Sequence, residues 1–124
     1  MRTTLPTLLL AATLSVPALA PAAGPRVIDV KLDSYSITPE TITVKTGEPV
    51  TLKVTNAAGM VPHNLIIQAP EAGIDVNLDL SGGKSGSATF TPTKPGRYEM
   101  HCDKKLLFFK SHKEKGMHGT LIVE

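Results

Sequence analysis

The sequence predicts an all-β domain, an antiparallel sandwich or barrel of about seven to eight short strands. Two observations support this fold class. Apolar residues alternate with polar ones, or β-branched residues cluster, in short segments that clusters of Gly, Pro, Asn and Ser separate. No segment carries the 3.6-residue apolar repeat of a long helix.

Each expected strand follows from its own local pattern. In the clearest case, Val50, Leu52 and Val54 alternate with polar residues, which places all three on one face of a strand. Between residues 59 and 83 the pattern is irregular and predicts one strand, which begins at His63. The strands are expected over residues 27–32, 41–45, 49–55, 63–68, 87–91, 98–102 and 120–123.

The composition limits the class of protein. The chain has 124 residues, of which 41% are hydrophobic and 19% charged, which fits one folded domain rather than a disordered chain. The formal net charge of +2 is too small for the basic groove of a nucleic-acid-binding protein, so no nucleic-acid partner is expected. A single cysteine excludes an internal disulfide and a zinc site built on paired cysteines.

The N-terminal segment has the order of a secretory signal peptide. Arg2 is the only charge before Arg26, an apolar stretch follows over residues 8–16, and small residues close the segment. The apolar stretch is too short to span a bilayer, so no membrane span is expected in the mature form. We expect removal of residues 1–22, leaving a single domain over residues 23–124 that is periplasmic or otherwise exported.

Four residues offer soft or nitrogen donors in a suggestive order. Cys102 ends a β-like run, and His112 and Met117 follow within the next fifteen positions. His63 lies upstream, at the start of an apolar strand. Two imidazoles, one thiolate and one weakly bound thioether suit copper that alternates between Cu(I) and Cu(II). Taken alone, Cys102 fits a small core residue equally well, so the interpretation depends on all four residues together.

The segments around these residues resemble the cupredoxins, the type 1 blue-copper proteins. Residues 61–66, where Asn64 follows the histidine, are similar to the family's first-ligand segment. Residues 95–102 resemble the strand that leads into the cysteine ligand. Residues 111–123 resemble the loop in which a histidine and a methionine precede the last strand. The resemblance implies a small plastocyanin- or azurin-like protein with a Greek-key β-sandwich and one copper ion per chain.

The resemblance also implies a role for each site residue. Cys102 would bind copper as a thiolate, and Met117 would be the weak axial ligand. His63 and His112 would bind as neutral imidazoles, with the ring edge of His112 toward the surface as the port for electrons. Asn64 would tie the His63 strand to the cysteine loop and support the hydrogen bonding of the sulfur.

The loop between Cys102 and His112 is longer than in the commoner small cupredoxins, because it holds nine residues. It contains an apolar cluster flanked by lysines, which should fold back on the barrel. We expect a short helical turn or compact bend over residues 103–109 that covers the copper end. Residues 103–115 hold five Lys against one Asp and one Glu, so this end is expected to be basic and to suit an acidic docking face on a redox partner.

Three further residues are weaker candidates for metal contacts. His101 and His118 neighbour two of the expected ligands on alternating strands, so their side chains should point away from the copper. Met60 lies three residues before the first histidine. Metal bound through these residues would indicate a protein of copper resistance or copper trafficking.

These observations predict a periplasmic electron-transfer protein that cycles copper between Cu(I) and Cu(II) and is not an enzyme. The alternative is a copper-resistance or copper-trafficking protein. A copper enzyme that reacts with small molecules ranks below both, because Met117 would close the coordination that an enzyme keeps open. The expected partners are redox proteins or, for the alternative, copper-handling proteins.

Overall fold

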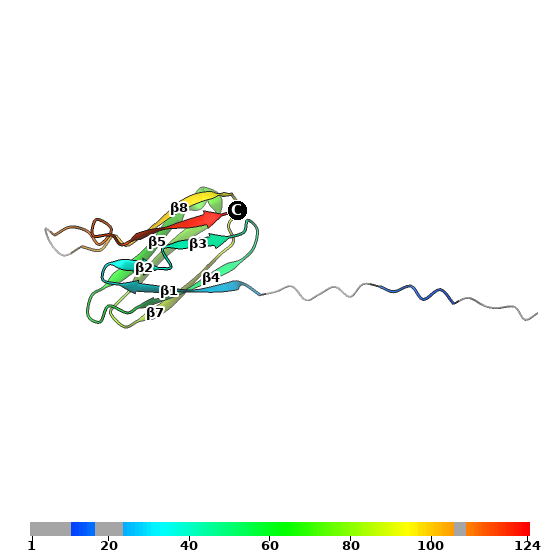
Figure 1. Cartoon of the computed structure of the whole chain (residues 1–124), viewed down its shortest axis with the longest axis horizontal. Helices are drawn as coiled ribbons and strands as arrows, with labels where there is room; N and C mark the ends of the chain where they lie inside the picture. The colour runs from blue at the N-terminus through cyan, green and yellow to red at the C-terminus, as the bar shows by residue number, and fades with distance from the viewer. Residues whose placement is uncertain (1–10, 17–23, 106–108) are drawn as a thin grey trace, which may run out of the picture.

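The computed structural model describes residues 11–16, 24–105 and 109–124, and the strands within them form two sheets that lie face to face (Figure 1). The first sheet has the strand order β2 (Ser36–Thr38), β1 (Arg26–Asp33), β4 (Val50–Asn56) and β7 (Ser85–Phe90). The second has the order β3 (Thr41–Val44), β9 (His118–Val123), β8 (Gly96–His101), β5 (His63–Ala69) and β6 (Ile74–Leu80). A 3₁₀ turn, η1 (Pro70–Ala72), joins β5 to β6.

The structure confirms the all-β fold class, and every range expected from the sequence overlaps a strand. Two strands, β2 and β6, lie outside the ranges expected from the sequence pattern. In β6, Ile74, Val76 and Leu78 do alternate with polar residues, but those polar residues are Asp and Asn. Asp and Asn are rare in strands, so they concealed an otherwise regular pattern.

Two strand pairs are parallel, although the sequence pattern predicted an antiparallel sandwich or barrel. β1 runs parallel to β4, with Val30 opposite Val54, and β3 runs parallel to β9, with Ile42 opposite Leu121. Parallel neighbours need a crossover connection rather than a tight turn. The chain supplies one after β2, because β3 lies in the second sheet and β4 returns to the first sheet beside β1. Both sheets are therefore mixed.

The core lies between the sheets and is filled by the inward residues of each strand. Val50, Leu52 and Val54 of β4 are buried, as their alternation predicts. Met100 of β8 is also fully buried on the inward face of its strand. Other members of this core are Leu32, Ile37, Val44, Leu65, Ile67, Ile74, Phe90 and Val123.

Two predictions fall partly outside the described residues. Of the predicted signal peptide, residues 1–22, the structure describes residues 11–16, which are exposed and form neither helix nor strand. The bend expected over residues 103–109 includes residues 106–108, which lie outside the described part. In the segments that are described, no helix has the length and apolarity needed to cross a membrane.

Candidate metal centre

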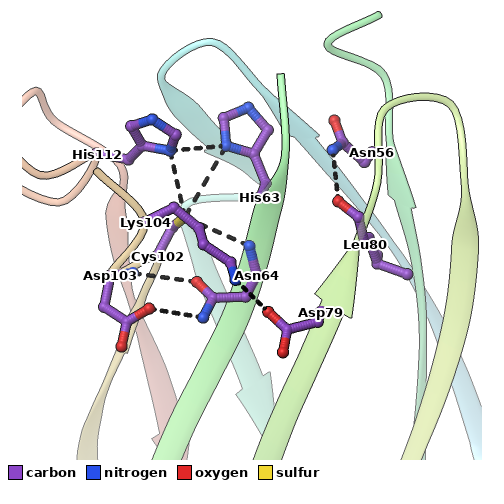
Figure 2. Close-up of polar contacts among 9 residues, drawn as sticks. All are labelled: Asn56, His63, Asn64, Asp79, Leu80, Cys102, Asp103, Lys104 and His112. Carbon is purple, nitrogen blue, oxygen red and sulfur yellow. Dashed lines mark hydrogen bonds and ion pairs between the residues drawn. The ribbon is translucent and has the colours of Figure 1, made fainter. Parts of the chain in front are cut away.

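Three donor atoms converge at one end of the sandwich (Figure 2). His63 is the first residue of β5, Cys102 directly follows β8, and His112 lies in the loop that leads to β9. The Nδ1 atoms of the two histidines are 3.1 Å apart. The Sγ atom of Cys102 lies 3.9 Å from Nδ1 of His63 and 3.5 Å from Nδ1 of His112. All three side chains are buried.

The triangle of donor atoms has the size of a metal site. A point equidistant from the three atoms lies roughly 2 Å from each, and metal bonds to imidazole nitrogen and thiolate sulfur are about 2.0 to 2.3 Å long for zinc. Two imidazoles and one thiolate in a trigonal arrangement are the donors of a blue-copper centre. Among the described residues, no second group of three His, Cys, Asp or Glu donors lies this close together. The residues present therefore fit one copper ion.

Burial favours the neutral form of both histidines. It lowers the pKa of His63, an effect that the neighbouring His112 reinforces and Asp33 opposes. Burial also lowers the pKa of His112, and the nearby Lys115 adds to that effect. A neutral imidazole has the free lone pair that binds a metal. Both rings are thus in their metal-binding form at neutral pH.

The environment of Cys102 disfavours a thiolate unless a cation is bound. Burial raises the pKa of the thiol, and hydrogen bonds from the backbone N–H groups of Asn64 and Lys104 oppose this shift in part. The N–H of Asn64 lies 3.4 Å from Sγ. A bound metal ion removes the thiol proton and supplies the missing positive charge.

Asn64 connects the His63 strand to the residue that follows Cys102. Its Nδ2 donates to the carboxylate of Asp103 over 2.7 Å, and the backbone N–H of Asp103 donates back to its Oδ1 over 3.0 Å. Together with the bond to sulfur, these contacts fix the start of β5 against the end of β8, as Figure 2 shows.

Asn56 performs a similar task at the end of β4. Its buried amide donates to the carbonyl oxygens of Val61, at 2.8 Å, and Leu80, at 2.9 Å. Leu80 lies opposite His63 in the register of β5 and β6. The amide therefore holds the chain just before His63. No local sequence pattern points to this role, because it depends on Leu80, which lies 24 residues away in the chain.

Backbone hydrogen bonds bring Met117 beside two of the three donor residues. The N–H of Cys102 donates to the carbonyl of Met117 over 3.2 Å, and the N–H of Met117 donates to the carbonyl of His112 over 3.0 Å. The Met117 side chain is fully buried. The fourth residue of the predicted ligand set thus lies at the same end of the sandwich as the other three.

A reciprocal cap shapes the turn that carries His112. The N–H of Ser111 donates to the Glu114 carboxylate over 2.8 Å, and the N–H of Glu114 donates to the Ser111 hydroxyl over 3.2 Å. This is a capping box, and its S-x-x-E spacing is visible in the sequence. Gly116, with a φ of 104° that favours glycine, ends the turn before β9.

Tyr35, which lies between β1 and β2, covers the histidine pair. The centre of its ring is 5.0 Å from that of His112 and 6.3 Å from that of His63. Nζ of Lys115 lies 4.4 Å from the ring centre and 3.3 Å from the hydroxyl. Tyr35 could not be identified from the sequence, because no local pattern connects it to residues so far along the chain.

An open cavity of about 490 Å³ lies against His112. Its apolar lining includes Met60, whose side chain is 97% exposed, and Pro62. Lysines, among them Lys105, contribute positive charge to the lining. Met60 therefore lies at the surface near the centre rather than within the buried donor cluster.

The other two weak candidates lie away from the donor cluster. His101 of β8 is opposite His118 of β9 in the antiparallel register. Nδ1 of His101 is 3.1 Å from a carboxylate oxygen of Glu99, and His118 is exposed. The structure therefore brings these two histidines together, but not with the buried donors.

Comparison with known proteins agrees with this architecture. No curated protein matches the chain. The structure resembles reduced auracyanin from Roseiflexus castenholzii, with a TM-score of 0.62 and 22% identity over 82% of this chain and 99% of that one. Auracyanin A, a "blue" copper protein from Chloroflexus aurantiacus, has a TM-score of 0.63 and 21% identity over 82% of this chain and 100% of its own. A mutant fern plastocyanin has a TM-score of 0.52 and 28% identity over 78% of this chain and 100% of its own. The sequence matches the Cupredoxin-like domain family over residues 6–123, and the chain therefore belongs to that family.

Proposed function

We propose that this protein is a periplasmic electron carrier in which one copper ion alternates between Cu(I) and Cu(II). The observation that carries the proposal is the buried triangle of His63, Cys102 and His112, whose donor atoms all lie within 4.8 Å of one another. Copper bound to these residues supplies one-electron chemistry. Met117 would complete the site as the axial ligand.

The surroundings of the donors suit an electron carrier. Asn64 and Asp103 hold the residues beside His63 and Cys102 through two side-chain hydrogen bonds. The capping box of Ser111 and Glu114 holds the turn of His112. Donors held in this way keep nearly the same positions in both oxidation states, which limits the reorganisation that accompanies each transfer.

The cavity beside His112 supplies a surface for a redox partner. Its lining combines apolar side chains with lysines, so it suits a partner whose contact face is apolar at the centre and acidic at the rim. Lys104, one of these lysines, pairs with Asp79 at 2.7 Å, which reduces its value for docking. Lys105 and Lys110 are exposed and would meet the acidic rim.

A second candidate function, copper trafficking, rests on Met60. This residue is almost fully exposed and lines the same cavity as His112, and thioethers bind Cu(I). A trafficking protein should give up Cu(I) to a competing chelator of moderate strength, whereas a carrier should keep its copper through repeated oxidation and reduction. A Met60→Leu variant should slow Cu(I) release only in the trafficking case.

The visible spectrum of the copper-loaded protein tests the primary proposal. The Cu(II) form should have a strong absorption band from thiolate-to-copper charge transfer, and Cys102→Ser should abolish it. Ser87→Ala, on an exposed position of β7, is a control that should retain the band. A wild-type protein without the band, or a serine variant that keeps it, contradicts the proposal.

Export is tested separately, by the mass of the protein recovered from the periplasm, which should lack residues 1–22.

A further inference from the structure

The outer face of β8 and β9 carries a pair of histidines that the buried centre does not use. His101 lies opposite His118, one residue beyond the pair formed by Cys102 and Met117. The N–H of Cys102 donates to the carbonyl of Met117, so these two residues are a hydrogen-bonded pair. Hydrogen-bonded and non-hydrogen-bonded pairs alternate along antiparallel strands, so the next pair, His101 and His118, is a non-hydrogen-bonded one. In antiparallel sheets such pairs have their side chains closest together.

A carboxylate shares this face. Strand alternation places Glu99 two residues before His101 on the same side of β8, while Met100 between them is buried in the core. Oε1 of Glu99 lies 3.1 Å from Nδ1 of His101. This contact does not form a hydrogen bond, and the nitrogen, which is buried, has no hydrogen-bond partner among the described residues. The nitrogen therefore remains able to bind a ligand.

Lys113 forms an ion pair with the Glu99 carboxylate. Its Nζ lies 2.7 Å from the same oxygen of Glu99, and a hydrogen bond from Lys113 is the main reason that the pKa of Glu99 is lowered. Lys113 and a metal cation would compete for this carboxylate. His118 is exposed, so its ring can rotate toward Glu99 and His101 without disturbing the core.

From this arrangement we infer a second, surface metal site formed by Glu99, His101 and His118, which takes a divalent transition-metal ion such as Cu(II). Imidazole nitrogens with a carboxylate oxygen are donors that suit Cu(II). The sequence has four histidines, so the two sites together account for all of them. The second site lies on the opposite side of the sheet from the buried donors, and two of its residues, Glu99 and His118, are exposed.

The test is a titration of the copper-loaded, oxidised protein with further Cu(II) at neutral pH. Wild type should bind one additional ion, with an electron paramagnetic resonance spectrum that shows nitrogen coupling and differs from that of the first ion. His118→Gln should weaken this second affinity by at least about tenfold, since even residues that only support a ligand are worth 10- to 100-fold. The thiolate-to-copper band should not change, because His118 is not a ligand of the first site.

A charge-matched pair of lysine variants makes the test specific. Lys113→Gln should strengthen binding of the second Cu(II), since it removes the cation that competes for Glu99. Lys84→Gln, which removes an exposed lysine elsewhere, should leave the affinity unchanged. The inference is overturned if wild type binds no second ion, or if His118→Gln binds it as tightly as wild type. Both outcomes can be read whether or not the first site proves to be an electron-transfer centre. A second ion bound here would count in favour of the copper-resistance or copper-trafficking alternative.

Discussion

At the scale of single residues, the surroundings of Cys102 determine its chemistry. A buried free cysteine is commonly an inert core residue. Here the sulfur lies within 4 Å of two histidine nitrogens and receives a backbone hydrogen bond from Asn64. Burial keeps the thiol protonated and the imidazoles neutral until a cation arrives. The same desolvation therefore prepares the histidines and makes the thiolate dependent on the metal.

This dependence predicts that binding of Cu(II) at neutral pH releases about one proton, which comes from Cys102. The raised pKa means that the thiol is protonated before binding, whereas the lowered pKa values mean that His63 and His112 are already neutral and have no imidazolium proton to release. Copper affinity should therefore fall as the pH falls. Calorimetry in two buffers of different ionisation enthalpy measures the proton count. Cys102→Ser should release none, and a wild-type count near zero contradicts the prediction.

Asn64 should matter for both stability and spectrum. Asn64→Ala removes two hydrogen bonds to Asp103 and leaves the Asp103 N–H without its acceptor, which should cost about 1 to 3 kcal/mol of the free energy of unfolding. The visible band of the copper-loaded protein should shift, because Cys102 is then held less firmly. Urea denaturation of the apo-protein and absorption spectroscopy measure the two effects. Asn77→Ala, at an exposed position in β6, should change neither.

At the scale of elements, close pairing of β8 and β9 connects the donor loop to the core. These strands are antiparallel from Gly96 opposite Val123 to His101 opposite His118, and the loop that joins them carries His112 and Met117. Met100 faces Gly119 across the pair. The absence of a side chain at Gly119 makes room for the Met100 methyl and for the carbonyl of Glu40, whose oxygen accepts the N–H of Thr120 over 2.8 Å.

Gly119→Ala should therefore destabilise the protein by about 1 to 3 kcal/mol, the usual cost of overpacking. A β-carbon at this position would collide with the carbonyl oxygen of Glu40 and lie 3.1 Å from the methyl carbon of Met100. Thermal unfolding of the apo-protein measures the loss. Gly24→Ala is the matched control, since a β-carbon there meets nothing within 4 Å. Equal stability of the two variants would show that β9 can shift away from Glu40.

At the scale of the whole molecule, the charges near the centre are partly paired within the protein. Lys104 pairs with Asp79 and Lys113 with Glu99, while Lys115 lies over the ring of Tyr35. The expectation that the whole run of lysines forms a docking field is therefore too broad. Among the described lysines of this end, Lys105 and Lys110 are the exposed ones that form neither an ion pair nor a contact with Tyr35 within the described residues.

Replacing Lys105 and Lys110 together by Gln should slow reduction of the Cu(II) form by an anionic donor such as ferrocyanide. The effect should be up to about tenfold at low salt and should largely vanish at high salt, because local charge mainly changes the association rate. The visible spectrum should stay the same. Stopped-flow absorbance measures the rates. Lys45→Gln with Lys94→Gln, the same charge change on exposed positions at the opposite end of the sandwich, should have a smaller effect. Equal slowing by the two double variants argues against a localised field.

Local sequence patterns determined much of this protein. The alternation in β4 and the turn clusters predicted the fold class. The order of His63, Cys102, His112 and Met117 predicted a ligand set, and the structure brings the donor atoms of the first three together. Such features lie within a few residues of one another or follow from a family resemblance. The alternation of apolar residues with Asp and Asn in β6 is local too. It did not predict a strand, because Asp and Asn are poor strand formers.

Tertiary structure decided everything that depends on distant partners. The parallel pairing of β1 with β4, the cover that Tyr35 gives to His112, and the ion pair of Lys104 with Asp79 each join segments that no local pattern relates. The opposition of His101 and His118 depends on the register of β8 against β9, which packing of the buried face sets. A shift of one residue in this register would have turned the side chain of His101 or His118 toward the core. The chemistry of the outer face is therefore a consequence of how the core packs.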